Sequence, residues 1–180
     1  MKLLFASDIH GSSYYTKMLI ERFLVEKADK LLLLGDILYH GPRNPLTKEY
    51  NPIEVANILN EYKEKIICVR GNCDSEVDQM VLEFPIKADY TQVLVDNFNF
   101  FLTHGHVYNE DFLLPSTESV FVYGHTHIPL LKKSHVFILN PGSISLPKEN
   151  YLPTYAIYEA GIIKLKTLTN NIIKELKLFD

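Results

Sequence analysis

The sequence lacks the features that mark several large classes of protein. It has only two cysteines, Cys68 and Cys73, whereas small disulfide-stapled secreted proteins are much denser in cysteine. Its longest apolar run is far shorter than the roughly 20 residues of a membrane-spanning helix, and no secretory signal peptide is visible at its start. We therefore expect a cytoplasmic protein that does not associate with membranes.

A large excess of charge of one sign is also missing. The chain has 18 Lys and Arg against 22 Asp and Glu, which gives a net charge of −4. Such a balance argues against a broad positive surface for long nucleic acids or anionic membranes. It is compatible with a small substrate that carries one or two phosphates.

Several sequence motifs are absent as well. There is no P-loop, no G-x-G-x-x-G fingerprint and no G-x-S-x-G nucleophile elbow, so the usual support for nucleotide-dependent kinases, dehydrogenases and serine hydrolases is missing. No repeat or low-complexity linker divides the 180 residues, and 47% of them are hydrophobic. We expect one folded domain over residues 1–180, because a chain of this length buries a full core.

Short apolar runs, each followed directly by polar residues, dominate the pattern. Runs of this length that are bounded by turn residues are typical of buried strands. Helical spacing of apolar residues separates the first three runs, over residues 12–27 and 52–65, with Ser12 or Ser13 as a cap for the first helix. The six runs cover residues 2–7, 30–34, 65–70, 98–103, 120–123 and 136–139.

The alternation of strand and helix predicts an α/β fold that begins with parallel strands. Residues 53, 56, 59 and 62 are expected to form the apolar stripe of the second helix. Asp96 and Asn97 are expected to form a hairpin turn between strands over residues 92–95 and 98–103. From Pro129 onward, successive strand-like segments suggest a second, mostly antiparallel sheet packed on the first.

Candidate metal ligands follow the apolar runs. Ligand sites of open α/β sheets lie beyond the carboxyl ends of the strands, and two His-x-His pairs make a shared site more plausible than isolated histidines do. Imidazoles, carboxylates and an amide suit borderline divalent metals, and the set is too large for one tetrahedral ion. It fits two metals about 3.5–4 Å apart that share a carboxylate. The candidates are Asp8, His10, Asp36, Asn72, His104, His125 and His127.

These residues resemble the calcineurin-like metallophosphoesterase superfamily. Its five blocks occur here in order, as D-I-H, G-D, G-N-C-D, H-G-H and G-H-T-H, and residues 140–143 (NPGS) extend the match. The segments DILYHGPR and GNCDSEVDQM are similar to the small bacterial phosphodiesterases of the YfcE type. The resemblance implies a four-layer α/β/β/α sandwich, with two mixed sheets flanked by helices.

The resemblance also assigns roles to individual residues. It implies that one metal is held by Asp8, His10, Asp36 and His127, and the other by Asp36, Asn72, His104 and His125, so that Asp36 is the bridge. It implies manganese as the metal, with Zn²⁺, Fe²⁺, Ni²⁺ or Mg²⁺ as alternatives. A hydroxide between the two metals would attack phosphorus in line with the leaving oxygen.

Cys73 departs from the family pattern, since many members have a histidine at this position that assists the leaving group. A thiol is a weak hydrogen-bond donor, so a small residue that leaves room in the pocket is the favoured interpretation, with a catalytic thiol or redox role as alternatives. Arg43 is a candidate for gripping a phosphate oxygen, and His40 for an acid near the leaving group. Either could instead only anchor a surface loop.

Asp74 and His106 are candidates for orienting the ligands. Asn140 is expected to help close the site, and His135 to be an exposed strand residue. Catalytic roles are thus predicted for Asp36, Asn72, His40, Arg43 and Cys73.

We predict metal-dependent hydrolysis of small phosphodiesters. The lack of a histidine at position 73 and of a basic cage for a dianion favours diesters over the alternative, a phosphomonoesterase. A non-catalytic scaffold, as in a retromer subunit of this fold, is disfavoured because all seven candidate ligands are present. A nuclease for long polymers is disfavoured by the net charge. The abundant aromatic residues and the resemblance suggest a homo-oligomer.

Overall fold

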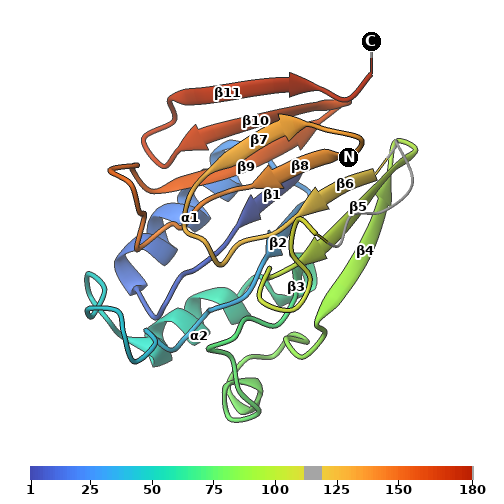
Figure 1. The fold of residues 1–180 in the computed structure, drawn as a ribbon. Coiled ribbons are helices and arrows are strands. Elements are labelled where there is room, and N and C mark those ends of the chain that lie inside the picture. Colours follow the sequence, from blue (N-terminus) through green and yellow to red (C-terminus); the bar gives the residue numbers. More distant parts are fainter. Residues whose placement is uncertain (112–118, 180) are drawn as a thin grey trace.

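The apolar runs form the strands of two mixed β-sheets, and two α-helices pack against one of them (Figure 1). This is the fold class that the sequence predicts. The computed structural model describes residues 1–111 and 119–179. The first sheet has the order β11-β10-β9-β1-β2-β3. Its strands are β1 (Leu3–Ala6), β2 (Lys30–Leu33), β3 (Ile66–Cys68), β9 (Thr154–Glu159), β10 (Ile162–Thr167) and β11 (Ile172–Lys177).

The parallel start of the fold is confirmed, since β1 pairs with β2 and β2 with β3 in parallel. All four residues of β1 are buried, as expected for a central strand with covered faces. The carboxyl ends of these three strands therefore meet at one edge of the sheet.

The second sheet has the order β4-β5-β6-β8-β7, with a parallel centre and antiparallel margins. The hairpin between β4 and β5 turns at Asp96 and Asn97, as predicted. Both residues have positive φ, at +51° and +68°, as a two-residue turn that matches the twist of its strands requires. The strands are β4 (Tyr90–Val95), β5 (Phe98–Thr103), β6 (Ser119–Val122), β7 (Leu130–Lys133) and β8 (Phe137–Asn140).

The expected assignment of the C-terminal strands to a second sheet is wrong in part. Only β7 and β8 lie in the second sheet, whereas β9 pairs antiparallel with β1 and extends the first sheet through β10 and β11. The strand β11 was not expected at all. Alternation along a strand defines its two faces but not its neighbour, so the sequence pattern alone could not place these strands.

Helix α1 spans Ser13–Val25, and the side chain of Ser12 caps it by accepting the N–H of Tyr15. Helix α2 spans Pro52–Asn60, with Asn51 as its cap. It ends five residues before the expected end, and the short 3₁₀ helix η1 (Lys63–Lys65) follows. The expected stripe also needs correction, because Ile53 is 72% exposed and Val55 is buried with Ala56 and Leu59.

Both α-helices cover the same outer face of the first sheet. Leu19, Phe23 and Val55 of the helices pack on Leu4 and Leu31 of the sheet. A second apolar cluster fills the space between the two sheets, where Phe5 meets Phe100 with ring centroids 5.6 Å apart. The far face of the second sheet carries an aromatic cluster instead, and it includes Phe101, Phe121 and Tyr123.

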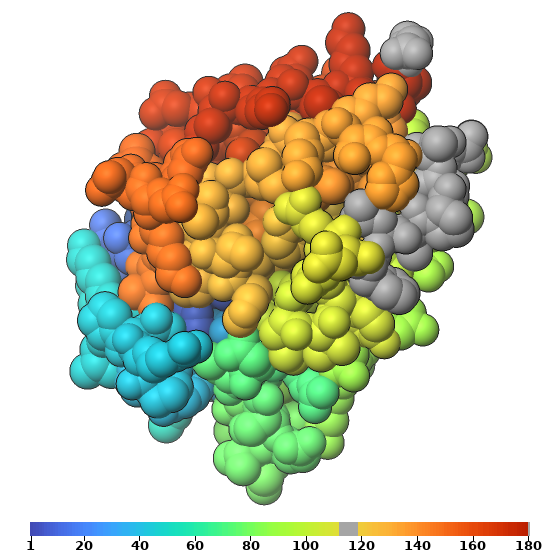
Figure 2. Space-filling view, in the orientation of Figure 1, coloured from blue at the N-terminus to red at the C-terminus, as the bar shows by residue number. Residues whose placement is uncertain are grey.

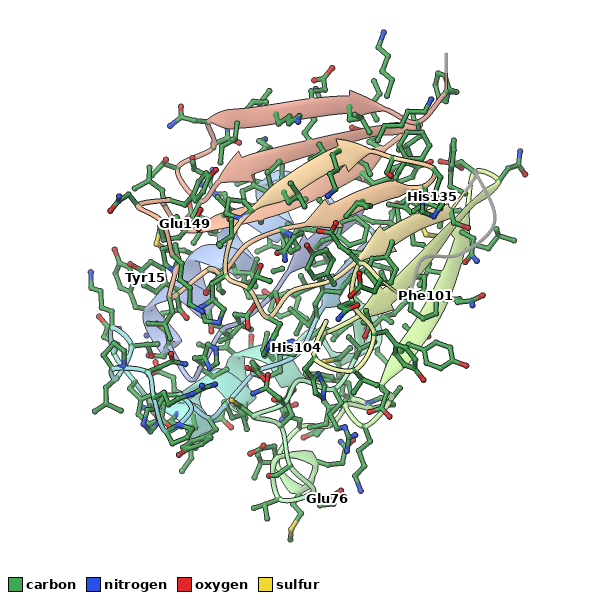
Figure 3. All side chains as sticks on the ribbon, viewed as in Figure 1. Tyr15, Glu76, Phe101, His104, His135 and Glu149 are labelled. Carbon is green, nitrogen blue, oxygen red and sulfur yellow. The ribbon has the colours of Figure 1, made fainter. Side chains whose placement is uncertain are left out.

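This architecture leaves one end of the sheets to the loops that carry the predicted ligands. His104 follows β5 at that end, whereas His135 lies at the opposite end of the second sheet (Figure 3). His135 is exposed, as expected, but it lies in the turn between β7 and β8 rather than in a strand. Among the described residues, no helix is long and apolar enough to cross a membrane.

Candidate metal centre

The seven predicted metal ligands meet at the loop-bearing end of the two sheets. Asp8 and His10 follow β1, Asp36 follows β2 and Asn72 follows β3. The second sheet contributes the other three, because His104 follows β5 directly and His125 and His127 follow β6. Five strand-end loops of two sheets would otherwise have no reason to place so many imidazoles and carboxylates together.

One half of the cluster is formed by Asp8, His10 and His127. The Oδ1 oxygen of Asp8 lies 3.2 Å from Nε2 of His127 and 3.6 Å from Nε2 of His10. The two imidazole Nε2 atoms are 3.4 Å apart. Oδ2 of Asp36 completes this group at 3.6 Å from Nε2 of His10. Four potential donor atoms therefore converge on one small volume.

The other half is formed around His104. Its Nε2 atom lies 3.5 Å from Oδ2 of Asp36, 3.0 Å from Oδ1 of Asn72 and 3.3 Å from Nδ1 of His125. Asp36 thus faces both halves through the same oxygen. Among the described residues, the groups that could hold a metal ion are Asp8 with His10 and His127, His10 with Asp36 and Cys73, and Asp8 with Asp36 and His104.

Hydrogen bonds to the main chain fix how three of the imidazoles point. In each, Nδ1 donates to a backbone carbonyl, because a carbonyl oxygen can only accept. The opposite atom, Nε2, is then left with its lone pair toward the cluster, which is the arrangement of a metal-binding histidine. His10, His104 and His127 donate to the carbonyls of Tyr39 (2.9 Å), Leu34 (2.6 Å) and Leu146 (2.7 Å), respectively.

The charges of the cluster fit divalent cations. Asp8 Oδ1 is buried and has no hydrogen-bond partner among the described residues, and a buried carboxylate oxygen in that state requires a cation or a proton nearby. Burial alone would raise the pKa of Asp8, but His10 and His127 hold it well below its usual value. Burial would lower the pKa of His104, but Asp36 and Asp8 raise it to about 9. The negative potential that attracts this proton also attracts a metal ion.

The backbone of the cluster is conformationally unusual. Five of the seven ligands have a left-handed φ, between +48° and +64°, where residues other than glycine are uncommon. Such strain persists only where the surroundings over-determine the conformation, and it is concentrated at functional sites. The five are Asp8, His10, Asp36, His125 and His127.

Two glycines allow the ligand loops to approach one another. A Cβ at Gly71 would collide with the carboxylate and the backbone of Asp36, and one at Gly124 would collide with the side chain of Ser7. These are the glycines of the G-N-C-D and G-H-T-H segments, so a need for space explains why glycine precedes Asn72 and His125.

Asp74 supports the cluster through the main chain. Its two carboxylate oxygens accept the backbone N–H groups of Asp36 (2.8 Å), Ile37 (2.8 Å) and Gly71 (2.7 Å). The side chain of Asp74 is buried, and burial raises its pKa. The backbone N–H of Cys73 donates to Oδ1 of Asp36 at 2.8 Å, which leaves Oδ2 for the centre of the cluster.

Asn140 supports the other sheet's ligands. Its side chain donates to the carbonyl of Gly124 (2.9 Å) and to the hydroxyl of Thr126 (3.0 Å), on either side of His125. His106 packs its ring at 5.3 Å from that of His104 and 6.3 Å from that of His125. Burial and the charge of His104 lower the pKa of His106.

A cleft of about 470 Å³ opens over the cluster. Three loops meet around it in Figure 2, drawn in cyan, green and orange. Arg43 and Cys73 line it, whereas the ring of His40 packs between Tyr39 and Tyr50. A larger cavity of about 640 Å³ lies around Lys2 and Phe179 and contains none of the predicted ligands, so the smaller cleft is the relevant one.

The sequence analysis did not single out two residues of the cleft wall, Tyr39 and Lys148. Tyr39 was visible only as part of the segment that follows Asp36. Lys148 follows the family-like NPGS segment by a few residues and is exposed. Loop residues of this kind follow no periodic pattern, so only their closeness to the cluster identifies them.

A model of the calcineurin-like phosphoesterase superfamily domain matches residues 1–161. The chain belongs to the calcineurin-like phosphoesterase superfamily. It is therefore a hydrolase of phosphoric ester bonds, and the clustered imidazoles and carboxylates are its candidate metal-binding residues. The sequence predicts this family from the five ligand blocks, and the match confirms it.

Comparisons with individual proteins agree. The chain is 46% identical to the phosphodiesterase YfcE of Escherichia coli K12 over 175 residues, which are 96% of this chain and 95% of YfcE. A solved structure of that phosphoesterase superposes with a TM-score of 0.96 at 44% identity and covers 99% of this chain and 100% of its own. The phosphodiesterase MJ0936 of Methanocaldococcus jannaschii is 28% identical over 151 residues, which are 79% of this chain and 83% of MJ0936.

Proposed function

We propose that this superfamily member hydrolyses small phosphodiesters with two divalent metal ions, and that manganese is the metal. One observation carries the proposal. Oδ2 of Asp36 lies 3.6 Å from Nε2 of His10 and 3.5 Å from Nε2 of His104, so one carboxylate faces two separate groups of ligands. A shared carboxylate is the hallmark of two-metal phosphoryl-transfer sites. The names of the YfcE and MJ0936 relatives support diesters as the substrate class.

Each ion would be held by four side chains. Asp8, His10, Asp36 and His127 would hold one, and Asp36, Asn72, His104 and His125 would hold the other. Mixed imidazole and oxygen ligands suit Mn²⁺ and also Zn²⁺, Fe²⁺ or Ni²⁺, whereas Mg²⁺ favours more oxygen ligands and bound water.

Bound ions would supply a nucleophile at neutral pH by lowering the pKa of a bound water, and they would neutralise charge on the phosphoryl oxygens. The chain's own residues do the rest. Asp74 and Cys73 hold Asp36 in place through backbone hydrogen bonds. Arg43 and Lys148 line the cleft and place positive charge where a phosphate anion must enter.

Two features favour diesters over monoesters. Burial and the charge of Asp36 raise the pKa of the Cys73 thiol to about 12, so this side chain stays neutral and donates only weakly at neutral pH. The second is the likeness to YfcE and MJ0936, both of which are named phosphodiesterases. Homo-oligomerisation and a cytoplasmic location stay predictions from the sequence.

The test compares the hydrolysis of bis-p-nitrophenyl phosphate with that of p-nitrophenyl phosphate. Each is measured with manganese, with zinc and with a chelator. We expect manganese-dependent turnover that favours the diester and that the chelator abolishes. Faster turnover of the monoester would assign the protein to the phosphomonoesterases of this fold. Lack of turnover with both esters, in protein shown to contain metal, would contradict the proposal and favour a scaffold.

A further inference from the structure

One aromatic side chain stands in the cleft beside the candidate metal centre. Tyr39 lines the cleft and is 40% exposed. Its backbone carbonyl accepts the 2.9 Å hydrogen bond from Nδ1 of His10, so the residue that carries the ring directly contacts a predicted metal ligand. A substrate whose phosphate reaches the metal centre would occupy the same cleft as Tyr39.

The ring of Tyr39 packs against a neighbouring ring of its loop. His40 packs against it edge to face, with ring centroids 4.8 Å apart and an interplanar angle of 76°. Tyr50 braces His40 in the same way, at 5.2 Å and 76°. The amide of Asn44 closes the loop with a 2.8 Å hydrogen bond to the carbonyl of His40. A ring held in this way loses little conformational freedom when a ligand binds, which favours affinity.

The surroundings of the ring are polar. The other lining residues are histidines, carboxylates, amides and small side chains, together with the basic residues Arg43 and Lys148. Specific small-molecule sites combine apolar surface with a few placed polar groups, and in this cleft Tyr39 provides the large apolar surface. The cleft thus combines a flat aromatic ring, two basic side chains and the candidate metal centre at which a phosphate would bind.

We propose that Tyr39 is a stacking platform for a planar ring of the substrate, and that the substrate is a diester of a nucleoside phosphate. This inference rests on the proposed function, because it needs the phosphate to lie at the metal centre. Nucleobases stack on aromatic side chains with little dependence on base identity, and loss of such a stack costs roughly fivefold or more in affinity. The ring recognises the planar group, while Arg43 and Lys148 face its phosphate.

The experiment measures binding rather than turnover. Isothermal titration calorimetry of the manganese-loaded protein compares nucleoside monophosphates, which are products of such a diester, with ribose 5-phosphate. Ribose 5-phosphate has the same phosphate and sugar but lacks the planar base. We expect at least one of adenosine, uridine and nicotinamide mononucleotides to bind at least about fivefold tighter than ribose 5-phosphate. The mononucleotide with the largest ratio identifies the kind of ring.

Substitutions test whether Tyr39 causes the difference in affinity between a mononucleotide and ribose 5-phosphate. Tyr39→Ala should bring the ratio to about one, and Tyr39→Phe should keep it, because phenylalanine preserves the ring. Tyr151→Ala is the matched control, since Tyr151 is 39% exposed and is not among the residues that line the cleft. A ratio within about twofold for all three mononucleotides, or a high ratio that survives in Tyr39→Ala, would overturn the inference.

Failure of this inference can be told apart from failure of the proposed function. If bis-p-nitrophenyl phosphate is hydrolysed with manganese but the binding ratio is about one, the phosphodiesterase stands and the stacking role of Tyr39 falls. If that ester is not hydrolysed by metal-containing protein, both fall together.

Discussion

The carboxylate of Asp74 accepts a 2.8 Å hydrogen bond from the backbone N–H of Asp36. Asp36 has a left-handed φ of +56°, so the contact holds a strained residue in the position where it faces both groups of ligands. The same carboxylate accepts N–H groups from Ile37 and Gly71. It therefore fastens the loop after β2 to the loop after β3.

Asp74→Ala should destabilise the protein by about 2–5 kcal/mol, because it leaves three buried backbone donors without their acceptor. Urea unfolding followed by circular dichroism measures the change. Glu76→Ala is the control, since Glu76 is exposed on the projecting loop (Figure 3) and should change stability by less than about 0.5 kcal/mol. Equal effects of the two substitutions would contradict the structural role of Asp74.

Asp36→Ala should remove the carboxylate common to both groups of ligands. We expect kcat on bis-p-nitrophenyl phosphate to fall at least about 1000-fold, as when a member of a catalytic unit is lost, and bound manganese to fall with it. Elemental analysis of the gel-filtered protein measures the metal. Glu83→Ala, at an exposed carboxylate outside the cluster, should keep both values. Full activity of Asp36→Ala at saturating manganese would reject the two-metal site.

Cys73→His should shift substrate preference toward monoesters such as p-nitrophenyl phosphate, and toward esters with poor leaving groups. An imidazole donates hydrogen bonds and protons at neutral pH, whereas burial and the charge of Asp36 raise the pKa of the thiol to about 12. Cys73→Ser is the control, because it keeps the size but introduces no general acid. The ratio of the kcat/KM values for the monoester and the diester is the measurement. An unchanged ratio would show that position 73 does not set the preference between monoesters and diesters.

Glu26→Gln should lower Tm at pH 7 by about 2–4 °C. Burial alone would raise the pKa of Glu26, but hydrogen bonds from Lys166 and Tyr155 outweigh it and lower the pKa. A carboxyl whose pKa is lowered in the folded state adds stability above its unfolded pKa of about 4.3 and loses it as pH falls through the folded pKa.

The Tm difference between wild type and Glu26→Gln should accordingly shrink as the pH falls below about 4. Differential scanning calorimetry from pH 7 to pH 3 measures it. Glu21→Gln is the control, because the ion pair of Glu21 with Arg22 is on the surface and its partner is the adjacent residue. A Tm difference that grows as the pH falls would contradict a lowered pKa of Glu26 in the folded protein.

The sequence predicts which side chains gather at one edge of the sheets better than it predicts how the strands pair. Asp8, Asp36 and His104 could be identified because each follows a short apolar run, and the carboxyl ends of strands are where such sites form. That local signal needs no knowledge of which strand lies next to which. The placement of β9 to β11 does need it, since β9 pairs with β1 from the other end of the chain.

Two other errors have local causes. Ile53 follows the spacing of a buried stripe yet is 72% exposed, because the face that α2 turns to the core runs through Val55 and Leu59 instead. Tyr39 and Lys148 were not found because a loop residue has no periodic pattern that reveals its role. Only the assembled cleft brings them beside the ligands.

The left-handed backbone at five ligands carries an evolutionary consequence. These are Asp8, His10, Asp36, His125 and His127. At each of these positions glycine would relieve the strain and ease folding, while any other side chain sustains it. The side chain at each of these positions is therefore expected to be of use in itself. A descendant of this fold that had given up catalysis would be free to drift toward glycine or asparagine at these five positions. Substitutions of this kind in a relative would indicate, from its sequence alone, that it has lost catalytic activity.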